Sequence, residues 1–161
     1  MSDPDATTPH YSLEIDRVLD APRNAVWRCW TEPNLLKQWY CPPPWRVTEA
    51  DIDLRAGGRM NCVMQGPEEG QRHDVIGCLL EVVPKERLTF TDGYSEGFIP
   101  RANPFMTGYV HLSDHDNGKT RMRWGARHTS AEDRQRHLDM GFEQGWGTAA
   151  SQLEALARTV T

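Results

Sequence analysis

The sequence predicts an α+β fold in which a curved antiparallel sheet of about seven strands packs against a long C-terminal helix. From residue 45 to residue 128, short segments with strand-like alternation are separated by turn residues. A further strand-like segment precedes them, with two short helical patterns in between. After Ser130 the apolar residues change to helical spacing and keep it for about six turns. This order predicts one sheet, two short helices after the first strand, and one long helix.

The first strand is predicted at residues 11–19, where Leu13 and Ile15 occupy alternate positions. Pro22 follows it and suits the first position of a helix, because a proline has no N–H group to leave unpaired there. Trp27 lies on the apolar side of the short helix that this proline begins.

A second short helix is predicted directly after the first. Thr31 is its expected N-cap, and Leu35, Leu36 and Trp39 form its apolar side. The three prolines that follow Cys41 prevent the helix from continuing.

Six more strands are predicted from the alternation of side chains, since a half-buried strand sends successive side chains to opposite faces. Gly, Pro and Asn-Gly turns separate these strands, and a longer loop is expected at residues 93–104. In residues 75–83 both faces are apolar, so alternation assigns neither face to the core. Elsewhere the residues that alternation places on the inner face are Met60, Cys62, Met64, Leu88, Phe90, Asp92, Met122, Trp124, Ala126 and His128.

The long helix is predicted from about Ala131 to Arg158, with Ser130 as its N-cap. Gly141 and Gly145 border its apolar stripe, which predicts a close approach to the sheet at these positions. Met140 falls on the opposite side, where it is either exposed or part of a homodimer contact. The stripe consists of Leu138, Phe142, Trp146, Ala149, Leu153, Leu156 and Val160.

Length and composition define the broad class of protein. A chain of 161 residues suits one domain, and a net charge of -5 argues against nucleic acid as a partner. Residues 1–10 lack the basic start and apolar run of a secretory signal, so we expect a disordered leader before a domain at residues 11–161. No segment reaches the roughly 18 apolar residues of a membrane span. We therefore expect a soluble, cytoplasmic protein without membrane contact.

The cysteines and histidines predict no metal site. The only close histidine pair, His111 and His115, has no second ligand pair at standard spacing. No glycine-rich phosphate loop is present either, so we expect neither a metal nor another cofactor. Four cysteines without a C-x-x-C pair are expected to be free thiols in a reducing cytoplasm; they are Cys29, Cys41, Cys62 and Cys78.

Several local motifs accompany this order of elements. They are Ala21-Pro22, Val26-Trp27, Trp30-Thr31-Glu32-Pro33, Leu36-Lys37-Gln38-Trp39-Tyr40, Asp53-Leu54-Arg55-Ala56-Gly57-Gly58, Glu81-Val82-Val83-Pro84, Arg87-Leu88-Thr89-Phe90-Thr91 and Met140-Gly141-Phe142-Glu143-Gln144-Gly145-Trp146. Together the order and the motifs resemble the START-like helix-grip superfamily, also called SRPBCC or the polyketide cyclase/dehydrase and lipid transport superfamily. Within it they resemble the branch related to activators of the heat-shock ATPase chaperone. The resemblance covers about residues 11–158 and implies the helix-grip fold, with no shared catalytic constellation to carry across.

The superfamily includes lipid and hormone carriers, aromatic polyketide cyclases and co-chaperones, so three hypotheses follow. The first is binding of a small hydrophobic or aromatic molecule between the sheet and the C-terminal helix. Several methionines and aromatic residues on one face suit an adaptable pocket, although the same residues could simply fill the core. The expected ligand-binding residues are Trp39, Tyr40, Met60, Cys62, Met64, Phe90, Asp92, Trp124, His128, Phe142 and Trp146.

The second hypothesis is a polyketide cyclase/dehydratase-like enzyme that uses proton transfer. Asp92 and His128 are its candidate catalytic residues, because burial could tune their acidity toward neutral pH, and Tyr94 and Arg101 lie in the adjacent loop. The alternative for His128 is a hydrogen-bonded structural role. The third hypothesis is a co-chaperone-like protein-binding module, for which Met140 and the loop at residues 42–45 are the outstanding surface features. The sequence leaves the ligand, any catalysis and the oligomeric state open.

Overall fold

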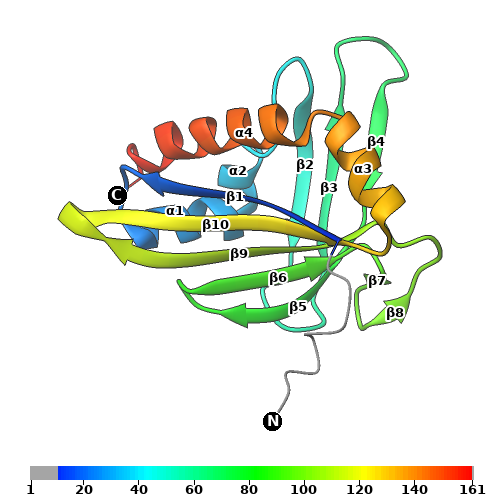
Figure 1. Ribbon diagram of the computed structural model, residues 1–161, viewed down its shortest axis with the longest axis horizontal. Coiled ribbons are helices and arrows are strands. Elements are labelled where there is room, and N and C mark those ends of the chain that lie inside the picture. The colour runs from blue at the N-terminus through cyan, green and yellow to red at the C-terminus, as the bar shows by residue number, and fades with distance from the viewer. Residues whose placement is uncertain (1–10, 161) are drawn as a thin grey trace.

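The computed structural model describes residues 11–160, so the expected leader at residues 1–10 lies outside the described part of the chain (Figure 1). The elements in chain order are β1 (Tyr11–Leu19), α1 (Arg23–Thr31), α2 (Pro33–Leu36), β2 (Arg46–Ile52), β3 (Met60–Gln65), β4 (Arg72–Val75), β5 (Cys78–Val83), β6 (Arg87–Thr91), β7 (Tyr94–Ser95), β8 (Ile99–Pro100), β9 (Met106–His115), the 3-10 turn η2 (Asp116–Gly118), β10 (Lys119–His128), α3 (Ala131–Asp139) and α4 (Phe142–Ala157).

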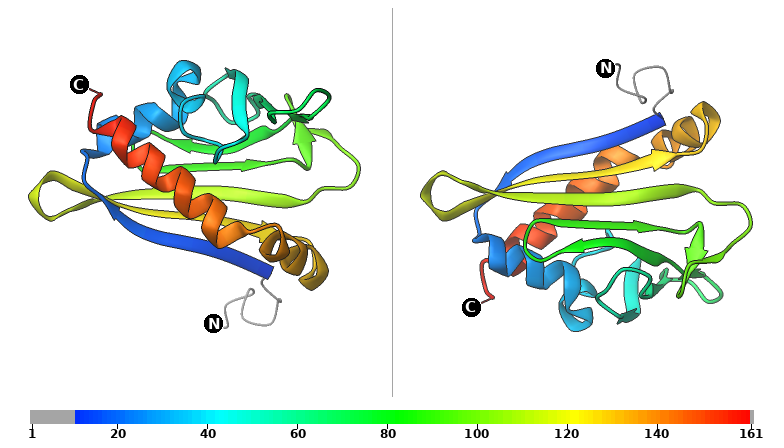
Figure 2. Two further views of the ribbon diagram at one scale, coloured as in Figure 1. Left: turned by 90° about the horizontal axis from the view of Figure 1, so that it is seen from above. Right: turned by 90° about the horizontal axis from the view of Figure 1, so that it is seen from below.

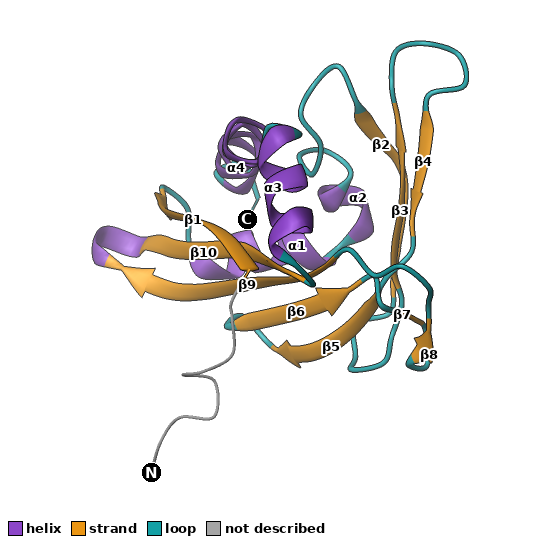
Figure 3. Ribbon diagram, turned by 45° about the vertical axis from the view of Figure 1, so that its right-hand side comes forward, coloured by secondary structure: helices purple, strands orange, loops and turns teal. Residues whose placement is uncertain are grey.

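Two antiparallel sheets form an angle that encloses the helices. Five strands pair in the order β1-β10-β9-β6-β5, and three pair in the order β2-β3-β4. The sheets meet where Met60 N donates to Gly77 O at 3.0 Å. Figure 3 shows β2, β3 and β4 standing up from one end of the larger sheet, with the helices inside the angle. Figure 2 shows α4 lying across one face of the five-stranded sheet. The predicted α+β helix-grip arrangement is therefore confirmed.

The structure has more strands than the sequence predicts, and they are divided among separate sheets. The structure divides residues 75–83, where alternation fails, between β4 and β5, and Ile76 and Gly77 lie between the two strands. The expected loop at residues 93–104 contains the two-residue strands β7 and β8, which pair with each other. Strands this short carry too little alternation to be recognised from a sequence.

Alternation assigns β10 correctly. Met122, Trp124 and Ala126 are buried against the helices. On the opposite face, Arg121 pairs with Asp16 of β1 at 2.6 Å, in an ion pair exposed to solvent. The inner face of this strand therefore contributes to the core and the outer face contacts water.

The prediction of one continuous C-terminal helix is wrong. The helix is interrupted between α3 and α4, where Gly141 has a left-handed backbone conformation with φ 87°. Its N–H donates to Leu138 O at 2.9 Å and closes α3, as glycine commonly does at the end of a helix. The predicted N-cap is confirmed, because Ser130 Oγ accepts from Asp133 N at 3.1 Å. The interruption rotates α4 relative to α3 and thereby buries His137 of α3, while Leu138 remains partly exposed.

The expected role of the glycines also needs correction. A side chain at Gly141 would meet no atom within 4 Å, and one at Gly145 would meet only Pro42 at 3.8 Å. The close approach is at Gly147 instead, where an added Cβ would lie 2.7 Å from the guanidinium of Arg17 on β1.

Thr31 is not the N-cap of the second helix. It is the last residue of α1, and its hydroxyl donates to Trp27 O at 2.9 Å. Glu32 precedes α2, and Pro33 occupies the first helical position. The threonine hydroxyl bonds back into the preceding turn, as a hydroxyl within a helix can.

The core lies between α1, α2, α4 and the inner face of the larger sheet. Trp30 and Trp39 are fully buried there, and Leu153 of α4 packs into the same cluster. Within the predicted apolar stripe, Phe142 and Leu153 are buried, whereas Trp146 and Leu156 are only partly buried. Residues of the first half of α4 line a cavity, whereas Leu153 in the second half packs into the core.

Candidate ligand-binding cavity

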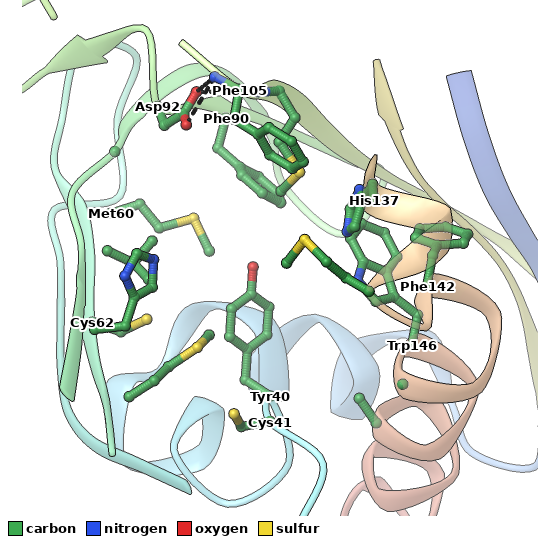
Figure 4. Close-up of a pocket in the computed structure, with 18 of the residues that line it drawn as sticks. Tyr40, Cys41, Met60, Cys62, Phe90, Asp92, Phe105, His137, Phe142 and Trp146 are labelled. Carbon is green, nitrogen blue, oxygen red and sulfur yellow. Dashed lines mark hydrogen bonds between the residues drawn. The ribbon is translucent and has the colours of Figure 1, made fainter. Parts of the chain in front are cut away.

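A cavity of about 390 Å³ lies in the angle between the two sheets (Figure 4). Strands β3, β4 and β6 form one side, and α3 with the first half of α4 forms the other. The segment after α2, with Tyr40 and Cys41, lies at its base in the view of Figure 4. The segment between α2 and the prolines that follow Cys41 therefore supplies part of the cavity wall.

Most of the expected ligand-binding residues line this cavity. They are Tyr40, Met60, Cys62, Met64, Phe90, Asp92, Trp124, Phe142 and Trp146. Trp39 and His128 do not. Trp39 is fully buried in the core, where its Nε1 donates to Cys29 O at 2.9 Å. His128 lies behind His137, which separates it from the cavity.

Aromatic rings hold one wall of the cavity in place. The rings of Trp124 and Trp146 stack with centroids 4.2 Å apart, and Phe142 lies 4.4 Å from Trp146. Tyr40 stacks on the other side of the same group, 6.1 Å from Trp124. Contacts between rings of this kind fix their orientation, so the wall is a preformed apolar surface.

Tyr40 brings a hydrogen-bond donor into these apolar surroundings. Figure 4 shows its hydroxyl pointing toward the middle of the cavity, and no described residue forms a hydrogen bond with it. Burial raises the pKa of Tyr40, with smaller contributions from Cys62 and Cys41. The phenol therefore stays protonated at neutral pH and can donate to a bound molecule.

The two cysteines of the cavity are neutral thiols. Burial raises the pKa of Cys62 to about 12 and also raises that of Cys41. Because the thiolate is the reactive form, neither is an activated nucleophile at neutral pH. All four cysteines of the chain are free.

Asp92 lies at the edge of the cavity and holds a loop. Its carboxylate accepts from Phe105 N at 2.9 Å and from Met106 N at 3.2 Å, as Figure 4 shows for Phe105. Arg101 donates to the Asp92 carbonyl at 3.2 Å, and it does not line the cavity. Tyr94 also lies outside, with its ring 6.1 Å from that of Phe98.

His137 is a cavity residue that the sequence analysis missed. It is 7% exposed, and its Nδ1 lies 2.8 Å from Nε2 of His128. The other ring nitrogen of His128, Nδ1, lies 2.8 Å from Tyr11 O. Burial, and to a smaller extent His128, lowers the pKa of His137 to about 4. His137 is therefore neutral at pH 7.

Two further observations apply to residues 11–160. No three His, Cys, Asp or Glu side chains there lie close enough together to hold a metal ion. None of the helices in this range combines the length and the apolarity needed to cross a membrane.

A family profile described as "Activator of Hsp90 ATPase homolog 1-like protein" matches residues 20–158. The chain belongs to this family. It is a START-type helix-grip family, in agreement with the fold and with the motifs of the sequence. No curated protein is significantly similar to the chain.

Solved structures share both fold and sequence with this family member. Protein NE0264 from Nitrosomonas europaea is 40% identical, with a TM-score of 0.87 over 91% of this chain and 94% of that one. Protein Ms6760 from Mycobacterium smegmatis is 30% identical, with a TM-score of 0.76 over 94% and 93% of the two chains. A protein from Arthrobacter aurescens is 27% identical, with a TM-score of 0.78 over 94% and 88%. These similarities extend along nearly the whole of each chain.

Proposed function

We propose that this member of the family binds a small, neutral, apolar or aromatic molecule in the cavity. The observation that carries the proposal is a space of about 390 Å³ with an unpartnered hydroxyl, that of Tyr40, pointing into it. Protein interiors are close-packed, and voids much larger than a water molecule are rare in them. Ligand pockets, by contrast, commonly enclose about 300–1000 Å³ with a few convergent polar groups.

The lining suits a planar apolar ligand of variable outline. Besides the aromatic wall, four methionines surround the space, and unbranched thioether side chains adapt to irregular shapes. Met140 is 71% exposed and lies at the α3–α4 junction. The four methionines are Met60, Met64, Met106 and Met140.

The charges around the cavity favour a neutral ligand. The described residues that line it include no lysine or arginine, and the carboxylate of Asp92 lies at its edge. A carboxylate or phosphate in this space would lose its hydration without gaining a lysine or arginine partner, which is costly; the basic side chains of the described lining are the histidines His73 and His137. Fatty acids and phosphorylated molecules are therefore poor candidates.

The other two hypotheses have less support. Proton transfer by Asp92 and His128 would need free atoms facing a substrate. The Asp92 carboxylate already accepts backbone N–H groups, and both ring nitrogens of His128 have partners. For a protein-binding module, the exposed side chain of Met140 is a single residue that also lines the cavity.

Equilibrium titration with N-phenyl-1-naphthylamine, a neutral fluorescent apolar probe, tests the proposal. We expect saturable binding of one probe per chain. Met64→Trp places a larger ring in the cavity and should weaken binding at least about tenfold, since it displaces apolar contact. The matched control is Gln65→Trp, on the next residue of β3 and outside the cavity lining, which should bind normally. Equal binding by both variants, or no saturable binding by the wild type, would contradict the proposal.

A further inference from the structure

The hydrogen bonds of the two buried histidines fix where the proton of His137 lies. A backbone carbonyl can only accept, so Nδ1 of His128 must donate to Tyr11 O. When each ring carries a single N–H, Nε2 of His128 has no proton and accepts from Nδ1 of His137. A neutral imidazole has only one N–H group. Nε2 of His137 is therefore left with a free lone pair.

This lone pair has no partner among residues 11–160. None of the described residues forms a hydrogen bond with Nε2 of His137, although only 7% of the residue is exposed. The atom is not sealed off either. In residues 11–160, the fully buried side-chain nitrogen or oxygen atoms that lack a hydrogen-bond partner are Nε1 of Trp30 and Nε1 of Trp124. Nε2 of His137 is not among them, so part of its surface is accessible. Because His137 lines the cavity, its free acceptor is available to a molecule inside it.

The surroundings keep His137 neutral and pack its ring among aromatic side chains. Within residues 11–160, the titratable group that lowers its pKa, in addition to burial, is His128 from β10. Phe142 and Trp146 of α4 face it at centroid distances of 5.0 and 5.5 Å, and Phe105 from the loop before β9 faces it at 5.2 Å. Figure 4 shows His137 beside Phe142 and Trp146 at the cavity wall. A hydrogen-bond acceptor held by apolar rings selects for a donor on the ligand.

We infer that the ligand is a neutral hydroxyl-bearing aromatic molecule, such as a phenol or naphthol, whose O–H donates to Nε2 of His137. This inference rests on the proposed function and adds a chemical class to it. His128 acts as a positioning residue, since it holds the proton on Nδ1 of His137 and so keeps Nε2 as the acceptor. An ether or hydrocarbon of the same shape would leave this buried acceptor unsatisfied, which disfavours its binding.

Equilibrium dialysis at pH 7 with 2-naphthol and 2-methoxynaphthalene tests the inference. The wild type should prefer 2-naphthol about tenfold or more, the effect of one unsatisfied buried acceptor. His137→Phe should bind both compounds with similar affinity. The control His111→Phe changes a histidine on β9 that does not line the cavity, and it should retain the preference.

The wild-type result stands even if His137→Phe fails to fold. In addition, 2-naphthol should move the 15N resonance of the unprotonated His137 nitrogen in the wild type, and the methyl ether should not. Equal affinity of the wild type for both compounds, with no change in this resonance, overturns the inference while leaving the cavity function intact. Failure of both compounds and of N-phenyl-1-naphthylamine to bind overturns both proposals.

Discussion

Burial of His137 should make the protein lose stability as the pH falls from about 6.5 to about 4. The ordinary histidine pKa of 6.5 is lowered to about 4 in the folded protein, first by burial and then by His128. Between these values the unfolded chain binds a proton at this residue and the folded chain does not, so protonation favours unfolding. Each tenfold change in proton affinity corresponds to about 1.4 kcal/mol, so the full difference lowers the free energy of unfolding by about 3 kcal/mol. The stability that depends on a neutral His137 is fully present above pH 6.5 and is lost as the pH falls toward 4.

Urea unfolding of the wild type and of His137→Phe at pH 7.0 and pH 4.5, followed by tryptophan fluorescence, measures this effect. Carboxylates also titrate over this range, so the decisive quantity is the difference between the two proteins. His128 is the titratable group that faces residue 137, and it is present in both. The wild type should lose about 2 kcal/mol more than the variant between the two pH values. An equal loss in both would refute the burial of a neutral histidine at this position.

Three further predictions concern the helix junction, the loop and the thiols. Gly141→Ala should lower the free energy of unfolding by about 1 kcal/mol because φ is 87° at this position. Gly145→Ala within α4 should raise it by up to about 1 kcal/mol, because alanine favours a helix interior and the added Cβ meets only Pro42 at 3.8 Å. Chemical denaturation that gave both changes the same sign would count against the interrupted helix. Asp92→Ala should cost about 1–3 kcal/mol by leaving the backbone N–H groups of Phe105 and Met106 unpaired, and an unchanged denaturation midpoint would argue against this anchoring. Iodoacetamide at pH 8 should modify the partly exposed Cys41 before the buried Cys62, and mass spectrometry showing the reverse order would contradict their placement.

The cavity wall was predictable from the sequence wherever it consists of strands. Met60, Cys62 and Phe90 were placed correctly because side-chain direction in a strand depends only on position along the chain. The same alternation, continued one residue past the end of β6, placed Asp92 on the inner side, and Asp92 lines the cavity.

His137 could not be found in the same way. Its burial depends on which side of α3 faces the cavity. That orientation is independent of α4 because the helix is interrupted at Gly141, whereas the predicted helix ran through this residue without interruption. The Asp139-Met140-Gly141 sequence did contain a signal, because a glycine directly after a helix is a common terminator. The bond between His137 and His128 was not predictable at all, since it joins a helix to a strand across the fold.

The directions of the Trp39 and Tyr40 side chains depend on tertiary packing, which no local sequence pattern describes. The predicted second helix put Trp39 on one apolar side with Leu36, but α2 ends at Leu36, and Trp39 turns into the core beside Trp30 at a centroid distance of 4.7 Å. Its neighbour Tyr40 takes the place in the cavity. The turn after α2 sends neighbouring aromatic side chains in different directions, and the tertiary contacts decide which of them faces the cavity.

The most direct test of the cavity as a ligand site is a crystal structure of the protein grown with 2-naphthol. We expect density for the two fused rings against Trp146 and Phe142, with the hydroxyl oxygen within hydrogen-bond distance of Nε2 of His137. A ligand bound elsewhere on the surface, or side chains that close the cavity while saturating 2-naphthol is present, would contradict the account.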